Sequence, residues 1–269
     1  MSAAFKRPLR TFFVLTYILF WVLFTITGLL VFLGVPEIYQ IIMKNVCAWT
    51  STFVILLFFN KFKPHKTLLS FIKQQFTKVT FSDFFIPMVL QIMIAVVAVI
   101  MVTLINQGNI RSIDFISASS ILPMLLINIT SGPLGEELGW RGYALVELNK
   151  RFNLFISAII IGSLWGFWHF PLWLVSGYSG FNLLFYALSF MLAIVSFSLF
   201  ITYFYNKKRN ILVAVWIHFI FNVLIQVVAF DNNELILLMF FIALLYSLVS
   251  FLIIIKNKNI FFADNRQKG

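Results

Sequence analysis

Cysteine and charged residues are scarce in this chain. Its one cysteine, Cys47, excludes an intrachain disulfide and any zinc site built from cysteines. Only 11% of the 269 residues are charged and 61% are hydrophobic, with a mean hydropathy of +0.98. This composition lies outside the range of soluble domains and indicates a polytopic membrane protein in a lipid bilayer. Because an excess of Lys and Arg in such a protein belongs in its loops, the net charge of +11 predicts no nucleic-acid partner.

Apolar runs of about 20 residues, enough to cross a bilayer, recur along the whole sequence. They lie near 11–34, 41–60, 84–106, 117–149, 154–177, 180–205, 210–229 and 234–255. The fourth run is long and contains Gly132-Pro133, which predicts a kink or a break into two half-helices. No internal repeat or linker divides the chain. We therefore expect an all-α transmembrane bundle of about eight spans, formed by residues 1–269 as a single membrane domain.

Lysine and arginine are distributed unevenly among the loops between these runs. All except Lys44, Arg111 and Arg141 fall at the two ends of the chain or in every second loop. Since basic residues mark cytoplasmic loops, we expect both termini in the cytoplasm, and the composition suits a bacterial cytoplasmic membrane. The first run, from Thr11, is too long for a signal peptide and lacks a cleavage site, so we expect it to be retained. The basic loop 61–80 suits either a short amphipathic helix on the cytoplasmic leaflet or a solvated linker.

Three charged residues interrupt the fourth run, within the segment GEELGWRGYALVEL. Each charge at the bilayer centre costs ~2.5–3.5 kcal/mol on insertion scales, so Glu136, Glu137 and Arg141 need partners. Glu137 and Arg141 are four residues apart, share one helix face and can form a favourable ion pair. Glu136 lies about 100° around the helix and is left without that partner.

Two later runs each carry a histidine. His169 follows Trp165 by four residues, and Asn222 follows His218 by four, so each pair shares a helix face. A rise of about 1.5 Å per residue brings these polar side chains to depths compatible with that of Glu136. A lone intramembrane His or Asn often serves only to join helices. The combination of these residues on three spans favours a functional site.

These side-chain types suit the hydrolysis of a peptide bond by an activated water. Glu136 is the candidate general base, and His169 could orient the base or the water. The N–H groups of a neutral His218 ring and of Asn222 could donate to a developing oxyanion. The same residues leave a zinc site open, with Glu136, His169 and His218 as ligands, although the H-E-x-x-H motif is absent. No Ser–His or Cys–His arrangement stands out.

The three motifs together resemble the CPBP family of intramembrane proteases, also called Abi. They are E-E-x-x-x-R at 136–141, an aromatic-x-x-x-His at 165–169 and His-x-x-x-Asn at 218–222. This family includes the Rce1-type CAAX prenyl endopeptidases and the bacteriocin-processing or immunity proteins. The resemblance covers about 115–230, which we expect to be the catalytic core. One departure is Trp165, where the family motif commonly has Phe.

The resemblance implies a helical fold with a cavity open to the cytoplasm and to the bilayer. It implies that Glu136 activates the water with help from His169, and that an oxyanion hole and a supporting pair complete the site. The oxyanion hole would be formed by His218 and Asn222, and the supporting pair by Glu137 and Arg141. No cofactor is expected, although the family is often described as metalloproteases and zinc remains the alternative.

The implied function is an intramembrane endopeptidase that cleaves a small peptide or a membrane protein, such as a bacteriocin or peptide-signal precursor. One alternative is a non-catalytic immunity or scaffold protein. Another is a transporter that uses Glu136 and Arg141 in an ion path, against which the halves show no repeat symmetry. The tryptophans near the motifs are expected to pack or to anchor the protein at the interface, without a chemical role: Trp140, Trp165, Trp168, Trp173 and Trp216.

Overall fold

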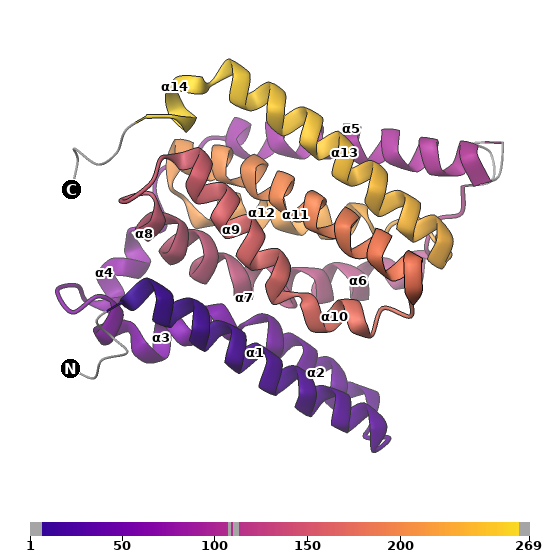
Figure 1. Ribbon diagram of the computed structural model, residues 1–269, viewed down its shortest axis with the longest axis horizontal. Helices are drawn as coiled ribbons and strands as arrows, with labels where there is room; N and C mark the ends of the chain where they lie inside the picture. The colour runs from indigo at the N-terminus through magenta and orange to yellow at the C-terminus, as the bar shows by residue number, and fades with distance from the viewer. Residues whose placement is uncertain (1–6, 107–108, 110–112, 264–269) are drawn as a thin grey trace.

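The chain folds into a bundle of helices, seen in a computed structural model that describes residues 7–106, 109 and 113–263 (Figure 1). In order, the helices are α1 (Pro8–Phe32), α2 (Glu37–Ala48), α3 (Thr50–Phe62), α4 (Leu68–Lys73), α5 (Phe81–Asn106), α6 (Ala118–Thr130), α7 (Pro133–Glu137), η3 (Leu138–Leu145), α8 (Val146–Leu148), α9 (Leu154–Trp168), α10 (Phe170–Leu174), α11 (Gly180–Lys208), α12 (Ile211–Leu224), α13 (Asn232–Lys256) and α14 (Lys258–Phe261). Among the described residues, β-structure is limited to one isolated bridge between Phe115 and Val228. The expected all-α membrane fold is confirmed.

Each of the eight predicted runs is helical, but fewer are long enough to cross a membrane. Five segments meet that criterion: α1, α5, α11, α13 and the broken segment Ala118–Leu148. The pair α2 and α3, bent by 53°, would be a sixth. The prediction of eight spans is corrected to five or six by this criterion, because α9 and α12 end after 15 and 14 residues.

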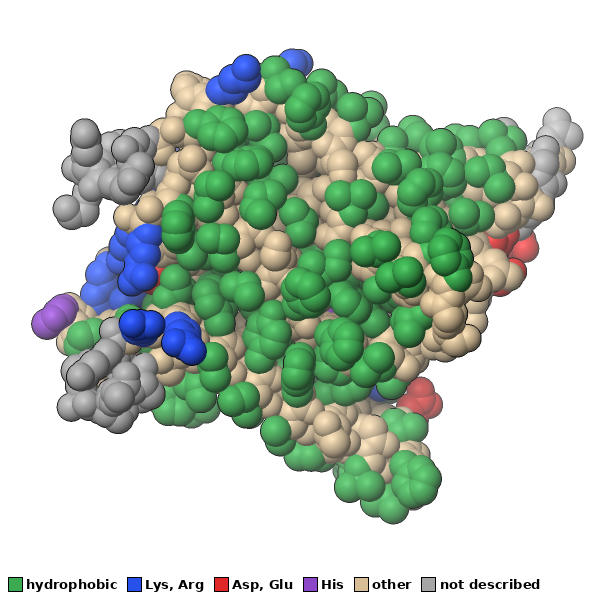
Figure 2. All heavy atoms as spheres, in the orientation of Figure 1, with side chains coloured by type: hydrophobic (Ala, Val, Ile, Leu, Met, Phe, Trp, Pro, Cys, Tyr) green, Lys and Arg blue, Asp and Glu red, His purple; other side chains and the backbone are tan. Residues whose placement is uncertain are grey.

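Both ends of the described chain lie at one end of the bundle, where α1 begins and α14 ends (Figure 1). On the face shown in Figure 2, most Lys and Arg side chains gather toward this end, whereas the most prominent Asp and Glu side chains lie toward the opposite end. This arrangement agrees with the topology expected from the loops, and the side of the membrane stays a prediction. Arg111 lies outside the described residues. The basic loop contains the six-residue helix α4, whose Phe71 is buried in the bundle.

Helix α11 forms the middle of the bundle and packs along α9 and α13. Small residues allow this close approach: a Cβ on Gly162 of α9 would lie 2.8 Å from the backbone of Val195 in α11. Nearby, Ser198 Oγ donates a hydrogen bond of 2.9 Å to the carbonyl of Ala158. Small residues and interhelical serine hydrogen bonds are the usual means by which membrane helices associate.

The fourth apolar run breaks at Gly132, as the sequence predicted. Helix α6 ends at Thr130, and α7 starts at Pro133. Proline is tolerated at the start of a helix because the backbone N–H that it lacks would have no partner within the first turn. The Thr130 carbonyl accepts a hydrogen bond of 2.8 Å from Trp49 Nε1, which satisfies one of the acceptors at the end of α6. The next segment, η3, is a π-helix, a wider turn that often occurs at functional sites. The break places Glu136 in the first turn of the new helix.

Two glycines bring α7 and η3 into close contact with the α2–α3 pair. A Cβ would lie 2.6 Å from the Trp49 ring at Gly135 and 2.6 Å from the Ser51 side chain at Gly139. Ser51 Oγ also donates a hydrogen bond of 3.1 Å to the carbonyl of Glu136. These contacts fix the backbone that carries the acidic pair.

Gly139→Ala is therefore expected to lower the free energy of unfolding by about 1–3 kcal/mol, because the added methyl group overpacks the contact with Ser51. Thermal unfolding of the purified protein in detergent measures this change. Gly28→Ala is the matched control, since a Cβ on Gly28 of α1 meets nothing within 4 Å. Equal melting temperatures for the Gly139→Ala protein and the wild type would contradict the prediction.

Candidate active site

The predicted ion pair is present and fully buried. Arg141 Nη1 donates to Glu137 Oε1 at 3.0 Å, and both side chains are 0% exposed. The same oxygen lies 2.8 Å from Nδ1 of His218. Glu137 thus connects η3 to α12, and it binds one of the two histidines predicted to belong to the site.

Glu136, the next residue toward the N-terminus, has a different environment. Its side chain is buried, and its Oε2 accepts a hydrogen bond of 2.6 Å from Trp165 Nε1. Among the described residues it has no ion-pair partner, and its second oxygen, Oε1, accepts no hydrogen bond. One oxygen of the candidate base is therefore anchored and the other is free to act.

The free oxygen lies close to the α-carbon of Gly132. The position that a Cβ would take there is 3.2 Å from Asn222 Nδ2, 3.5 Å from Glu136 Oε1 and 3.5 Å from His218 Nε2. Because glycine has no side chain, the three polar atoms can approach its backbone this closely. The structure thus brings three of the four predicted catalytic residues around one point.

The fourth residue, His169, stands where α9 ends. Its Nδ1 is 2.7 Å from the carbonyl of Trp165, which only accepts, so Nδ1 carries a proton and Nε2 is free. Helix α9 ends here because Pro171 has no backbone N–H to donate to a carbonyl of the preceding turn.

A cavity of about 240 Å³ connects His169 with Glu136 and reaches α1 and α2. A water molecule in the liquid occupies about 30 Å³, so several waters fit. The lining is largely apolar and consists of Phe20, Phe24, Thr27, Lys44, Cys47, Ala48, Ser131, Glu136, Trp168, His169 and Leu172.

The geometry bears on how His218 could donate to an oxyanion. Glu137 is a carboxylate held by Arg141 and can only accept, so Nδ1 of His218 carries a proton. In a neutral ring Nε2 would then have none, and it can donate to an oxyanion only when both nitrogens are protonated. The spacing of the motif had suggested a neutral donor, because a helix face does not show which ring nitrogen is already bound.

The alternative zinc ligands are not arranged as a metal site. Across residues 7–106, 109 and 113–263, no group of three or more His, Cys, Asp or Glu side chains could hold a metal ion. Among the described residues, Glu136 Oε1 and the Nε2 atoms of His169 and His218 have no protein hydrogen-bond partner, so the misfit lies in how these atoms are spaced. In this arrangement the three residues do not form a three-ligand zinc site.

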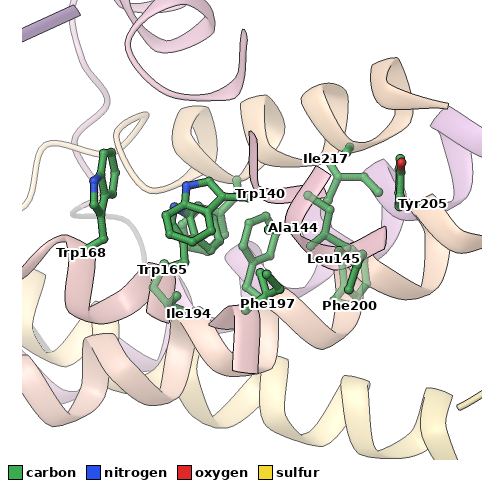
Figure 3. Packing of buried hydrophobic residues seen from close by; sticks show 14 of the residues in the cluster. Trp140, Ala144, Leu145, Trp165, Trp168, Ile194, Phe197, Phe200, Tyr205 and Ile217 are labelled. Atoms are coloured by element: carbon green, nitrogen blue, oxygen red, sulfur yellow. The ribbon is translucent and has the colours of Figure 1, made fainter. Parts of the chain in front are cut away.

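Trp165 makes a contact with the candidate site that the sequence did not reveal. It was expected only to pack, yet it bonds to the candidate base. The spacing to His169 placed it on the right face but did not show where its N–H points. Trp140 and Trp168 are at most 1% exposed, belong to the buried cluster of Figure 3 and do pack as expected.

Comparison with known proteins agrees with the motifs. Residues 118–224 match the family model described as type II CAAX prenyl endopeptidase Rce1-like. The chain carries an Rce1-like region. CAAX prenyl protease 2 of Methanococcus maripaludis is 29% identical over 245 residues, which are 87% of this chain and 89% of that protein. The family resemblance is confirmed, and this Rce1-like region supports an intramembrane endopeptidase, embedded in a bilayer and acting on a peptide.

Glu137→Gln is expected to lower the free energy of unfolding by about 3–5 kcal/mol, because it leaves Arg141 buried without a counter-charge. Glu136→Gln is the matched control, since it removes a neighbouring carboxylate that has no ion-pair partner among the described residues. Thermal unfolding of both variants in the same detergent makes the comparison. Similar melting temperatures for the two would show that the ion pair does not hold this segment.

Proposed function

We propose that the Rce1-like chain hydrolyses peptide bonds with a water activated by Glu136, without a metal ion. The observation that supports this most is the convergence of Glu136 Oε1, Asn222 Nδ2 and His218 Nε2 beside Gly132, each within 3.5 Å of the position that a Cβ would take there. A carboxylate oxygen with no hydrogen-bond donor is suited to take a proton, and the amide nitrogen beside it is suited to stabilise negative charge.

In the proposed reaction, Glu136 Oε1 takes one proton from a water while the water oxygen attacks the scissile carbonyl carbon. The carbonyl oxygen becomes an oxyanion, which accepts a hydrogen bond from Asn222 and one from a doubly protonated His218. When the C–N bond breaks, Glu136 returns its proton to the leaving nitrogen, so the enzyme ends as it began. His169 orients the attacking water through its free Nε2.

For the substrate, we propose a small or membrane-associated peptide, such as a bacteriocin or peptide-signal precursor, cleaved at a bacterial cytoplasmic membrane. The named relative is a CAAX prenyl protease. A farnesylated peptide that ends in a CAAX sequence and carries a quenched fluorophore is therefore the first probe to use, with candidate precursors beside it.

Glu136→Gln is expected to reduce cleavage of the probe at least about 100-fold, since a general base contributes about 10²–10⁴-fold. Purified protein in detergent is assayed with and without a chelator, and cleavage is expected to persist with the chelator present. Loss of activity that zinc restores would instead establish the metalloprotease. If Glu136→Gln and the wild type behave alike in the assay and in cells, a non-catalytic immunity or scaffold role replaces the enzyme.

Gly132→Ala is expected to reduce kcat about 100-fold or more, because its methyl group takes the position at which the three polar atoms converge. The melting temperature should change little by comparison. Gly28→Ala, which adds the same group in open space on α1, is expected to retain full activity. An active Gly132→Ala protein would mean that the reacting groups meet elsewhere.

A further inference from the structure

A buried tryptophan anchors the candidate base. Trp165 Nε1 donates to Glu136 Oε2 at 2.6 Å. A hydrogen bond this short to a carboxylate is typical of the strong, charge-assisted kind. Phenylalanine has no N–H and could not make it.

The hydrogen bond determines which oxygen of Glu136 is available to take a proton from water. A glutamate side chain has several rotatable bonds, and a carboxylate with two free oxygens could present either of them. With Oε2 held by Trp165, Oε1 is the oxygen that lies toward His218 and Asn222, 3.5 Å from the position that a Cβ would take on Gly132.

The indole is itself held in place from several sides. The guanidinium carbon of Arg141 lies 4.2 Å from the centre of the Trp165 ring, within cation–π range. The ring of His218 meets it edge to face, with centroids 5.1 Å apart. Trp165 is 1% exposed and lies in the buried cluster shown in Figure 3, so its N–H has little freedom to turn from Glu136.

We propose that Trp165 is a positioning residue that fixes Oε2 of Glu136 so that Oε1 faces the reacting water. This inference rests on the proposed role of Glu136 as the base. It makes the indole N–H, rather than the aromatic ring alone, a requirement for full activity in this chain.

The test compares Trp165→Phe with Trp140→Phe. Both residues are almost fully buried, but Nε1 of Trp140 has no hydrogen-bond partner in the structure. Trp165→Phe is expected to lower kcat about 10- to 100-fold, the factor that corresponds to losing a hydrogen bond to a charged group. KM should stay within about twofold, since Trp165 acts on the base rather than on substrate binding. Trp140→Phe should keep wild-type kinetics.

The pH profile of kcat distinguishes an effect on the position of Glu136 from a smaller amount of folded protein. A smaller active fraction lowers every point equally, whereas a change at the base moves the pH of half-maximal activity. If Trp165→Phe does not fold, residue 165 can be replaced by β-(3-benzothienyl)alanine, which keeps the bicyclic ring but has sulfur in place of N–H. The same lower kcat and displaced profile are expected.

The proposal would be overturned if a folded variant without the N–H kept the wild-type kcat and pH profile. It would also be overturned if Trp140→Phe lowered kcat as much as Trp165→Phe. The proposed function is judged separately. If Glu136→Gln is inactive while Trp165→Phe is fully active, only the positioning role fails. If Glu136→Gln is as active as the wild type, the proposed base fails and the positioning role with it.

Discussion

The buried pair of Glu137 and Arg141 is the interaction on which the rest of the site depends. Two charges at 0% exposure are costly to remove from water, and each is tolerable only while the other is present. The oxygen that binds Arg141 also lies against His218, so the pair fixes α12 as well as its own segment. Loss of this contact would displace the imidazole from its place beside Gly132 and Asn222.

Two adjacent glutamates thus have different surroundings. Glu137 is paired with Arg141, whereas Glu136 faces a cavity with one oxygen held by Trp165 and the other without a hydrogen bond among the described residues. Neighbours on a helix point about 100° apart, so a single segment can present one carboxylate to packing and the other to chemistry. The glycines at 135 and 139 hold that segment against α2 and α3, which keeps the two directions distinct.

Residue spacing predicted the parts of this structure that depend on helix periodicity. The ion pair of Glu137 with Arg141 and the break at Gly132-Pro133 follow from local geometry and proline chemistry. The π-helix η3, the partner of His218 Nδ1 and the direction of the Trp165 N–H could not be predicted, because they depend on how separate helices pack. Fewer segments meet the length criterion for a span than the sequence predicted for a related reason: apolar composition continues past Trp168, but helix α9 ends there.

Three of the four site residues lie where helices begin or end inside the protein, and this placement has a physical reason. Glu136 follows the break at Gly132, His169 terminates α9, and Asn222 lies in the last turn of α12. Interrupted helices leave backbone polar groups unpaired, which a bilayer tolerates only where protein or water satisfies them. Hydrolysis needs water at the same depth. A broken helix beside a cavity satisfies its unpaired backbone groups and has access to water. The irregular backbone and the proposed hydrolysis therefore favour the same place in the bundle.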